Sequence, residues 1–313
     1  MMRAWVLFAC ILATGPLEAA EADKLLPNDS EYVVTVNVRV LLDSALAKKY
    51  GLPKMRELIK SDEEVQDIFK SLGLDPLADI HSLTLASTNI SDPSKALFIL
   101  HGKFNPDKFH AKAQEVIQTY GEILKIHKAE PVRYYEVNFP GQSFFVALIN
   151  STTIVASPGK DGVLEALEKA AGKKKSEVKK ELLNLLEKVD AGRTLWMIGL
   201  KSALEHSPLS ADETARPILG KIETAAAGVT VAADIQAEFT LSAKSPEAAM
   251  EVSKELVEKL DKAKGIVSIL VGDVKELQIL LELVGALKVS TENRIVTLRG
   301  QIGEEAIEKS LKK

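Results

Sequence analysis

The chain has 313 residues, of which 46% are apolar and 27% are charged, and its formal net charge is −4. These values are typical of an average globular protein, and the length favours two domains or one large one. The charge excludes the strong basic excess that nucleic-acid binding requires, so we expect no nucleic-acid partner.

The first 22 residues have the layout of a secretory signal peptide. Arg3 precedes the apolar run AWVLFACILA (residues 4–13), and the small residues Ala20 and Ala22 stand where a signal peptidase reads the chain. The run is too short for a bilayer span, which needs about 20 apolar residues. We therefore expect cleavage after Ala22, with a lipid-anchored Cys10 and a retained N-terminal anchor as minor alternatives. Because Cys10 is the only cysteine, the exported chain would contain no disulfide and no thiolate site.

The predicted elements that follow alternate between strands and helices. Patterning predicts strands over residues 31–38, 81–88, 95–103, 133–139, 143–149 and 152–156, and helices over residues 40–49, 62–72, 106–120 and 161–171. Two helix starts are marked in the sequence. Ser61-Asp62-Glu63-Glu64 is a capping box, and Asn105-Pro106-Asp107 combines a cap, a first-turn proline and an acidic residue.

The second part of the chain repeats this order. Strands are predicted over residues 194–200, 227–232, 235–243, 287–290 and 294–299, and helices after residue 200, from Ser245-Pro246-Glu247, and over residues 304–311. We therefore predict an α+β fold of two similar halves, each a mainly antiparallel sheet with helices packed on one face. The alternative is a chance likeness of element order, since residue identity between the halves is low.

The predicted boundaries follow from this repeat. They are residues 1–22 for the signal peptide, 23–172 for the first α+β repeat, 173–189 for a lysine-rich linker and amphipathic helix, and 190–313 for the second repeat. Residues 265–287 are the most apolar region of the mature chain, but four charged residues interrupt them, so we expect no membrane span in the mature chain. We predict that this region is buried between the halves, with a partner surface as the secondary interpretation.

The sequence contains no assembled catalytic or metal-binding motif. G-x-S-x-G and H-E-x-x-H are absent, and the five histidines have no spacing that fixes a metal geometry. We therefore predict no catalytic, cofactor-binding or metal-binding residues and no cofactor. The alternative is a small-ligand-binding or hydrolytic enzyme whose site assembles from distant residues, with candidates from His101, His110, Lys160 and Asp161.

Two basic features suggest weak anion binding. Ser157-Pro158-Gly159-Lys160 is similar to the end of a phosphate loop but lacks its upstream glycine, so Lys160 is a weak anion-site candidate at an otherwise ordinary helix start. A lysine cluster between Lys169 and Lys180 is interleaved with glutamates and carries no aromatics, which favours a solvated linker face. In the aromatic hairpin around Tyr134, core packing explains most of the rings. Tyr134, or one of the pair Phe144 and Phe145, is a candidate for a binding surface.

Four segments carry a resemblance to a known family. They are LLPNDSEYVVTVNVRVLLDS (25–44), GLDPLADIHSLTLAS (73–87), SDPSKALFILHGKFNPDKF (91–109) and ASPGKDGVLEAL (156–167). On these segments the chain resembles a family of exported planctomycete-type bacterial proteins of unknown function. The resemblance implies export to a bacterial envelope and brings no catalytic residues.

These observations together predict an exported, non-catalytic α+β protein. We expect a binding or structural role in the periplasm or cell envelope. The expected partner is an envelope protein or polymer, and the chain is expected to be a monomer or a weak homo-oligomer.

Overall fold

The computed structural model describes residues 20, 22–129, 132–271 and 282–312. Its strands are β1 (Tyr32–Val36), β2 (Ile80–Ser87), β3 (Ala96–Gly102), β4 (Leu124–Ala129), β5 (Val132–Phe139), β6 (Gln142–Asn150), β7 (Thr153–Ser157), β8 (Leu195–Leu200), β9 (Ile222–Val231), β10 (Ile235–Ala243), β11 (Lys288–Glu292) and β12 (Ile295–Ile302). Its α-helices are α1 (Val38–Asp43), α2 (Leu52–Ser61), α3 (Glu63–Leu72), α4 (Pro106–Thr119), α5 (Lys160–Ala170), α6 (Lys180–Leu186), α7 (Lys201–Glu205), α8 (Arg216–Leu219), α9 (Pro246–Val271) and α11 (Glu304–Lys312). A π-helical turn (Ala47–Gly51) and two 3₁₀ turns (Pro93–Lys95 and Pro208–Ala211) complete them.

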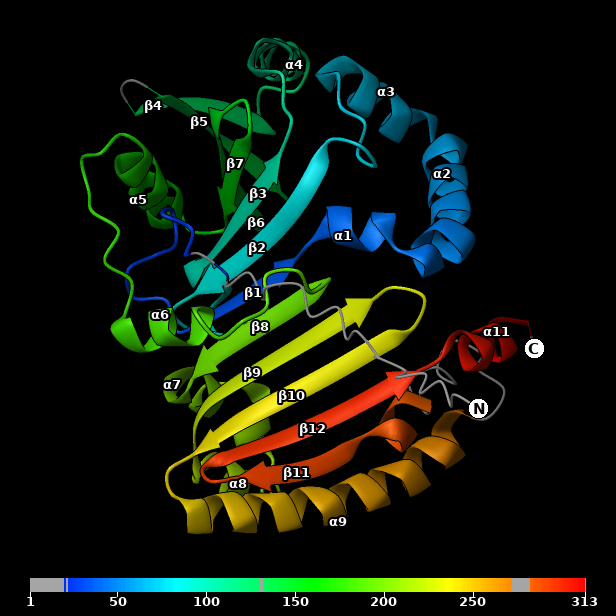
Figure 1. Cartoon of the computed structure of the whole chain (residues 1–313). Helices are drawn as coiled ribbons and strands as arrows, with labels where there is room; N and C mark the ends of the chain where they lie inside the picture. The colour runs from blue at the N-terminus through cyan, green and yellow to red at the C-terminus, as the bar shows by residue number, and fades with distance from the viewer. Residues whose placement is uncertain (1–19, 21, 130–131, 272–281, 313) are drawn as a thin grey trace, which may run out of the picture.

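All the strands belong to one sheet of twelve, in the order β11-β12-β10-β9-β8-β1-β2-β3-β7-β6-β5-β4 (Figure 1). Every neighbouring pair is antiparallel. The α+β class with a large antiparallel sheet is therefore confirmed. The expectation of a separate sheet for each half is wrong, because β1 and β8 pair directly and make the two parts continuous.

The order of strands outward from the β1–β8 pair is the same in both directions. One side reads β1-β2-β3-β7-β6 and the other reads β8-β9-β10-β12-β11, with β5 and β4 added at the end of the first. In each part the third strand is followed by a long helix, α4 or α9, which begins at the predicted cap-proline-acid sequence. The side chain of Asn105 accepts a hydrogen bond from the Lys108 amide at 3.0 Å, and the Ser245 hydroxyl accepts one from Ala248 at 3.2 Å.

Helices cover both faces of the first part of the sheet. Tyr134 and Tyr135 are neighbours on β5 and so point to opposite faces. Tyr134 packs in the cluster that contains α5, whereas Tyr135 packs with α4, and their side chains are only 4% and 2% exposed. Packing on one face only is therefore wrong for this part, because β5 is buried on both sides. We call the two sides the α5 face and the α4 face.

Beyond β8, the second part of the sheet carries described helices on the α4 face alone. Helices α8 and α9 pack Ile218, Ala249 and Val252 against Val296 of β12, and α7 adds Leu204 to this cluster. On the α5 face, α6 buries Leu182 and Leu186 against the β1–β8 region. Among the described residues, no helix lies over β9, β10 and β12 on that face, which Figure 1 shows turned toward the viewer. We call this surface the open face.

Several predicted boundaries differ from the structure. The helix expected over residues 40–49 is interrupted, since Ser44 is extended between α1 and the π-helical turn. Helix α2 and strand β4 were not predicted, and the amphipathic helix expected over 178–189 is limited to α6. Helix α3 does end at Gly73, whose φ of +63° is the left-handed conformation that glycine favours.

The apolar region at residues 265–287 extends beyond the described part of the chain, because residues 272–281 lie outside it. Its first residues belong to α9, which packs along β10, β11 and β12 at one end of the sheet. Within the described residues, no helix combines the length and apolarity that crossing a membrane requires.

Candidate functional site

A groove crosses the open face, and its floor follows from the alternation of β9 and β10. On β10, Ile235, Ala237, Phe239 and Leu241 point to the α4 face, which leaves the intervening polar residues on the open face. The register places these next to small residues of β9: Gln236 pairs with Thr230, Glu238 with Gly228, Thr240 with Ala226, and Ser242 with Thr224. The floor is therefore small, polar and solvent-facing.

The groove has two compartments. The first has a volume of about 150 Å³ and lies between the floor and a wall that includes Leu185, Lys188 and Trp196. The second has a volume of about 570 Å³ and is lined by Thr230, Gln236, Lys288, Arg299 and Gln301, among others. Three residues line both compartments: Asp190, Arg193 and Glu238. The second volume lies within the range of roughly 300–1,000 Å³ that ligand sites occupy. We call the two compartments together the open-face groove.

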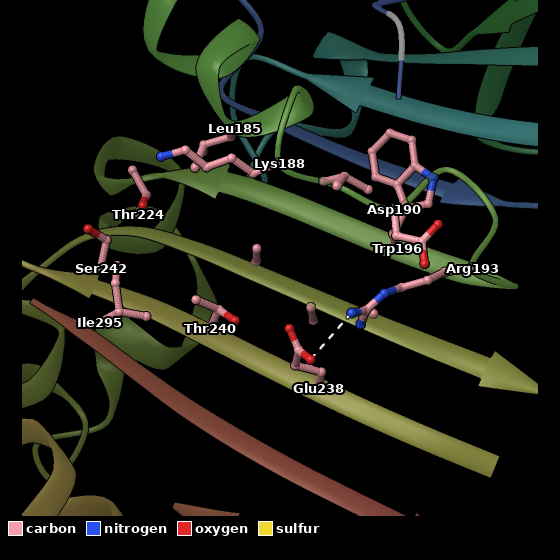
Figure 2. Close-up of a pocket in the computed structure, with 14 residues that line it drawn as sticks. Leu185, Lys188, Asp190, Arg193, Trp196, Thr224, Glu238, Thr240, Ser242 and Ile295 are labelled. Carbon is pink, nitrogen blue, oxygen red and sulfur yellow. Dashed lines mark ion pairs between the residues drawn. The ribbon is translucent and has the colours of Figure 1, made fainter. Parts of the chain in front are cut away.

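An ion-pair network stands where the compartments meet. Figure 2 shows Arg193 reaching across β9 to Glu238, and the Arg193 Nη2 to Glu238 Oε2 distance is 3.4 Å. Arg299 approaches the same oxygen from β12, with its Nε at 2.8 Å. The loop that carries Arg193 is held by the residue that follows β1, because the side-chain amide of Asn37 donates to the Ala191 carbonyl at 2.9 Å. The ion pairs therefore link two strands, β10 and β12, to this loop.

Gly228 provides the space in which Arg193 lies. A Cβ atom at Gly228 would stand 2.2 Å from Nη1 and 2.4 Å from Cδ of Arg193. We predict that Gly228→Ala displaces Arg193 and lowers the free energy of unfolding by about 1 kcal/mol, the upper range for a partly exposed ion pair. Arg193→Ala added to this variant should cost little more. A double-mutant cycle by chemical denaturation measures this coupling, and fully additive losses would contradict the predicted contact.

The predicted signal-cleavage residues lie against the folded sheet. The Ala20 amide donates to the Val189 carbonyl at 3.1 Å, and Ala20 is buried in the main core cluster. Ala20 and Ala22 line a separate cavity of about 370 Å³ over the β1–β2 pair, where Trp196 forms another part of the lining.

His101 fastens the segment that follows the predicted cleavage site. Its Nε2 lies 2.6 Å from Oδ2 of Asp23, and its Nδ1 lies 3.3 Å from the Thr153 hydroxyl. The hydrogen bond that His101 donates to the Asp23 carboxylate raises the pKa of His101, although burial opposes this. Because the folded-state pKa of His101 is raised, its pair with Asp23 stabilises the fold fully at pH values below the unfolded-state pKa, about 6.5. This stabilisation is lost as pH rises through the folded-state pKa.

We predict that the attachment of this segment weakens above neutral pH. His101→Gln keeps a hydrogen-bond donor but does not titrate, so wild type should exceed it in stability at pH 5.5 and not at pH 8.5. The difference is expected to stay below about 1 kcal/mol, because the pair is partly exposed and solvent screens it. Denaturation of both proteins across this pH range measures it, and a gap independent of pH would refute the role of His101.

The residues proposed for an assembled enzyme site are not brought together. His110 contacts the Tyr135 hydroxyl on the α4 face, whereas His101 lies on the other face. Lys160 begins α5 and its ammonium stands 5.9 Å from the centre of the Tyr134 ring. Asp161 occupies the first turn of the same helix. Within the described ranges no three histidine, cysteine, aspartate or glutamate residues form a group that could hold a metal ion.

The lysine cluster and Tyr134 differ from their predicted environments. Lys169 is not solvated: its side chain is 2% exposed and its Nζ lies 2.7 Å from Oε1 of Glu165. Lys174 pairs with the other Glu165 oxygen at 2.9 Å. Tyr134 is buried and stacks on the His127 ring at 4.9 Å, so it does not form a binding surface. Lys169 and Lys174 of the cluster therefore form ion pairs with Glu165 of helix α5.

The α4 face carries partly exposed apolar side chains at the centre of the sheet. Leu83, Met197 and Phe239 are the large members, with Met197 41% exposed and Phe239 38% exposed. Met197 and Phe239 stand on either side of Ala227 in the cross-strand register. An exposed apolar patch is what the binding interpretation predicts and an enzyme does not require.

Comparisons with known proteins identify no family. No family model matches the chain, and no curated protein matches it. Among solved structures, crystal form I of TP0453, a Treponema protein, covers 93% of this chain and 97% of its own, with 8% sequence identity and a TM-score of 0.46.

Proposed function

We propose that this protein is an exported binding protein of the bacterial envelope that holds a ligand in the open-face groove. The observation that carries the proposal is a groove of ligand size on the uncovered half of the sheet. Its floor is built of small and polar side chains, and its arginines are held in place by Glu238. Such a surface is preorganised for recognition without being filled by the chain itself.

The charged groups of the groove favour binding over catalysis. Glu238 is shared by two guanidinium groups, so it is poorly suited to accept a proton from a substrate. Asp190 accepts a hydrogen bond from the Gly192 amide at 2.9 Å and thereby shapes the loop. Both carboxylates therefore have a positioning role in this proposal.

The proposal is tested by blocking the groove. Thr240→Trp places a large ring on the floor, whereas Phe239→Trp changes the next residue on the opposite face and serves as the matched control. Ligands from a panel of envelope sugars, peptides and lipids should raise the thermal midpoint of wild type and of the control but not of Thr240→Trp. If a ligand stabilises all three proteins equally, it binds elsewhere on the protein. That result would contradict the proposal that the groove is the binding site.

Export remains a proposal that rests on the N-terminal sequence and on the planctomycete-type resemblance. We expect the chain recovered from a bacterial periplasm to begin at Asp23. Intact-mass measurement tests this start. A mass that retains residues 1–22 would support an anchored form, and an added diacylglyceryl group on Cys10 would support the lipoprotein alternative.

We also propose that the two parts of the sheet arose by duplication. The identical strand order on each side of β1–β8 and the two cap-proline-acid helix starts support this origin. Superposition of β1-β2-β3-β7-β6 on β8-β9-β10-β12-β11 tests it. A poor fit of α4 on α9 in that superposition would favour a chance likeness.

A further inference from the structure

The open-face groove is basic on a chain that is acidic overall. Four basic residues line it, namely Lys188, Arg193, Lys288 and Arg299, against two acidic residues, Asp190 and Glu238. The whole chain carries a formal net charge of −4. A local excess of positive charge in a concave site attracts anions.

The positive charge is only partly neutralised by the groove itself. Among the described residues, Glu238 is the single acidic partner of Arg193 and Arg299, and each guanidinium has five N–H donors. Lys188 and Lys288 have no ion-pair partner among the residues that the structure describes. Donors therefore remain for an acidic ligand, and arginine forks suit carboxylate and sulfate groups.

The uncharged lining indicates a ligand that is also rich in hydroxyl groups. Thr224, Thr240 and Ser242 present hydroxyls in the first compartment, and Thr230, Gln236 and Gln301 line the second. The amide nitrogen of Gln236 is 3.1 Å from Oδ2 of Asp234, and Gln301 donates to the same oxygen, which leaves both carbonyl oxygens as acceptors. Such a surface offers donors and acceptors together, as sugar hydroxyls require.

We propose that the open-face groove binds a segment of an acidic polysaccharide. The acidic groups of the sugar contact Arg193, Arg299 and Lys288, and its hydroxyls contact the threonine, serine and glutamine side chains. This inference rests on the proposed binding function and specifies its ligand class. The small residue Ala226 on the floor lets a sugar ring lie close to the sheet.

The test uses four probes on the exported chain: an oligogalacturonate, a heparin-derived oligosaccharide, a neutral cello-oligosaccharide and a poly-glutamate peptide. Binding is measured by calorimetry at low and at raised salt. We expect an anionic oligosaccharide to bind, with affinity that falls as salt is added, and the other two probes to bind at least tenfold more weakly. The first two probes distinguish carboxylate from sulfate as the recognised group.

Two substitutions locate the binding. Arg299→Gln removes one exposed guanidinium. It should weaken the affinity for the anionic oligosaccharide about tenfold, which is the effect of one hydrogen bond to a charged group. Arg56→Gln, which removes an equal charge from the exposed surface of α2, should leave the affinity unchanged. Circular dichroism confirms that both variants are folded.

The outcomes separate this inference from the proposed function. If the neutral sugar or poly-glutamate binds as tightly as the anionic sugars and Thr240→Trp abolishes that binding, the acidic polysaccharide is the wrong ligand class. The open-face groove would then still be the binding site. Binding of the anionic sugars that Thr240→Trp and Arg299→Gln leave intact would overturn it as well, because the site would lie elsewhere. If no probe binds the wild-type chain, the acidic-polysaccharide inference is wrong, whereas the groove is then judged by its own ligand panel.

Discussion

Replacing Ile198 with alanine should lower the free energy of unfolding by about 3 kcal/mol. Ile198 is fully buried on β8, where it pairs with Val33 of β1 on one side and Ala226 of β9 on the other. It belongs to the same core cluster as Leu182 and Leu186 of α6. The lost methyl groups would leave a cavity where the two parts of the sheet join, and close-packed neighbours could fill it only in part.

The adjacent residue provides a matched control for this prediction. Met197 lies on the same strand but points to the α4 face, where it is 41% exposed. Met197→Ala should therefore cost less than about 1 kcal/mol, since its side chain already contacts water. Urea denaturation of the three proteins gives both values. Equal losses for the two variants would mean that the β1–β8 junction is not a packed core.

Local features of the fold could be predicted from short stretches of sequence. Helix α3 begins where the capping box predicts a helix start. Its cap is Asp62, which accepts a hydrogen bond from Val65 at 3.0 Å, and not the predicted Ser61, whose hydroxyl donates to the Leu58 carbonyl. The hairpin turn expected at Asn293 is present, with a φ of 52°. These features depend on residues within a few positions of one another, so the pattern that encodes them is complete in the sequence.

The continuity of the sheet could not be predicted in the same way. It depends on Thr35 meeting Trp196 across β1 and β8, which are about 160 residues apart in the chain. Antiparallel pairing has no residue code that names a distant partner strand. The sequence therefore does not determine the number of sheets, and two halves of similar pattern predict one sheet each.

The open-face groove does have a signal in the sequence. Strand β10 alternates strictly between apolar residues and the polar set Gln236, Glu238, Thr240 and Ser242. Such alternation indicates a strand with one uncovered face. The contribution of Arg193 could not be inferred, because it comes from a loop and depends on the space above Gly228.

Replacing Glu165 with leucine should lower the free energy of unfolding by about 3 kcal/mol, because it leaves a buried ammonium without its carboxylate. Lys169 is 2% exposed, and its remaining described partner would be the Leu26 carbonyl. Glu168→Leu, on the exposed side of the same helix, is the control and should have little effect. The further change Lys169→Met should recover much of the loss, since a paired apolar replacement restores packing without the unpaired charge.

The same pair gives this prediction a pH signature. Burial raises the pKa of Glu165. Hydrogen bonds from Lys169, Lys174 and the Asn28 amide lower this pKa by a larger amount together, so the net shift is downward. Because the folded-state pKa of Glu165 is lowered, its ion pairs stabilise the fold fully at pH values above the unfolded-state pKa, about 4.3. This stabilisation is lost as pH falls through the folded-state pKa. The gap between wild type and Glu165→Leu should therefore be widest near neutral pH and narrow in acid. A gap that stays constant between pH 7 and pH 3 would show that lost packing, not the ion pair, accounts for the destabilisation.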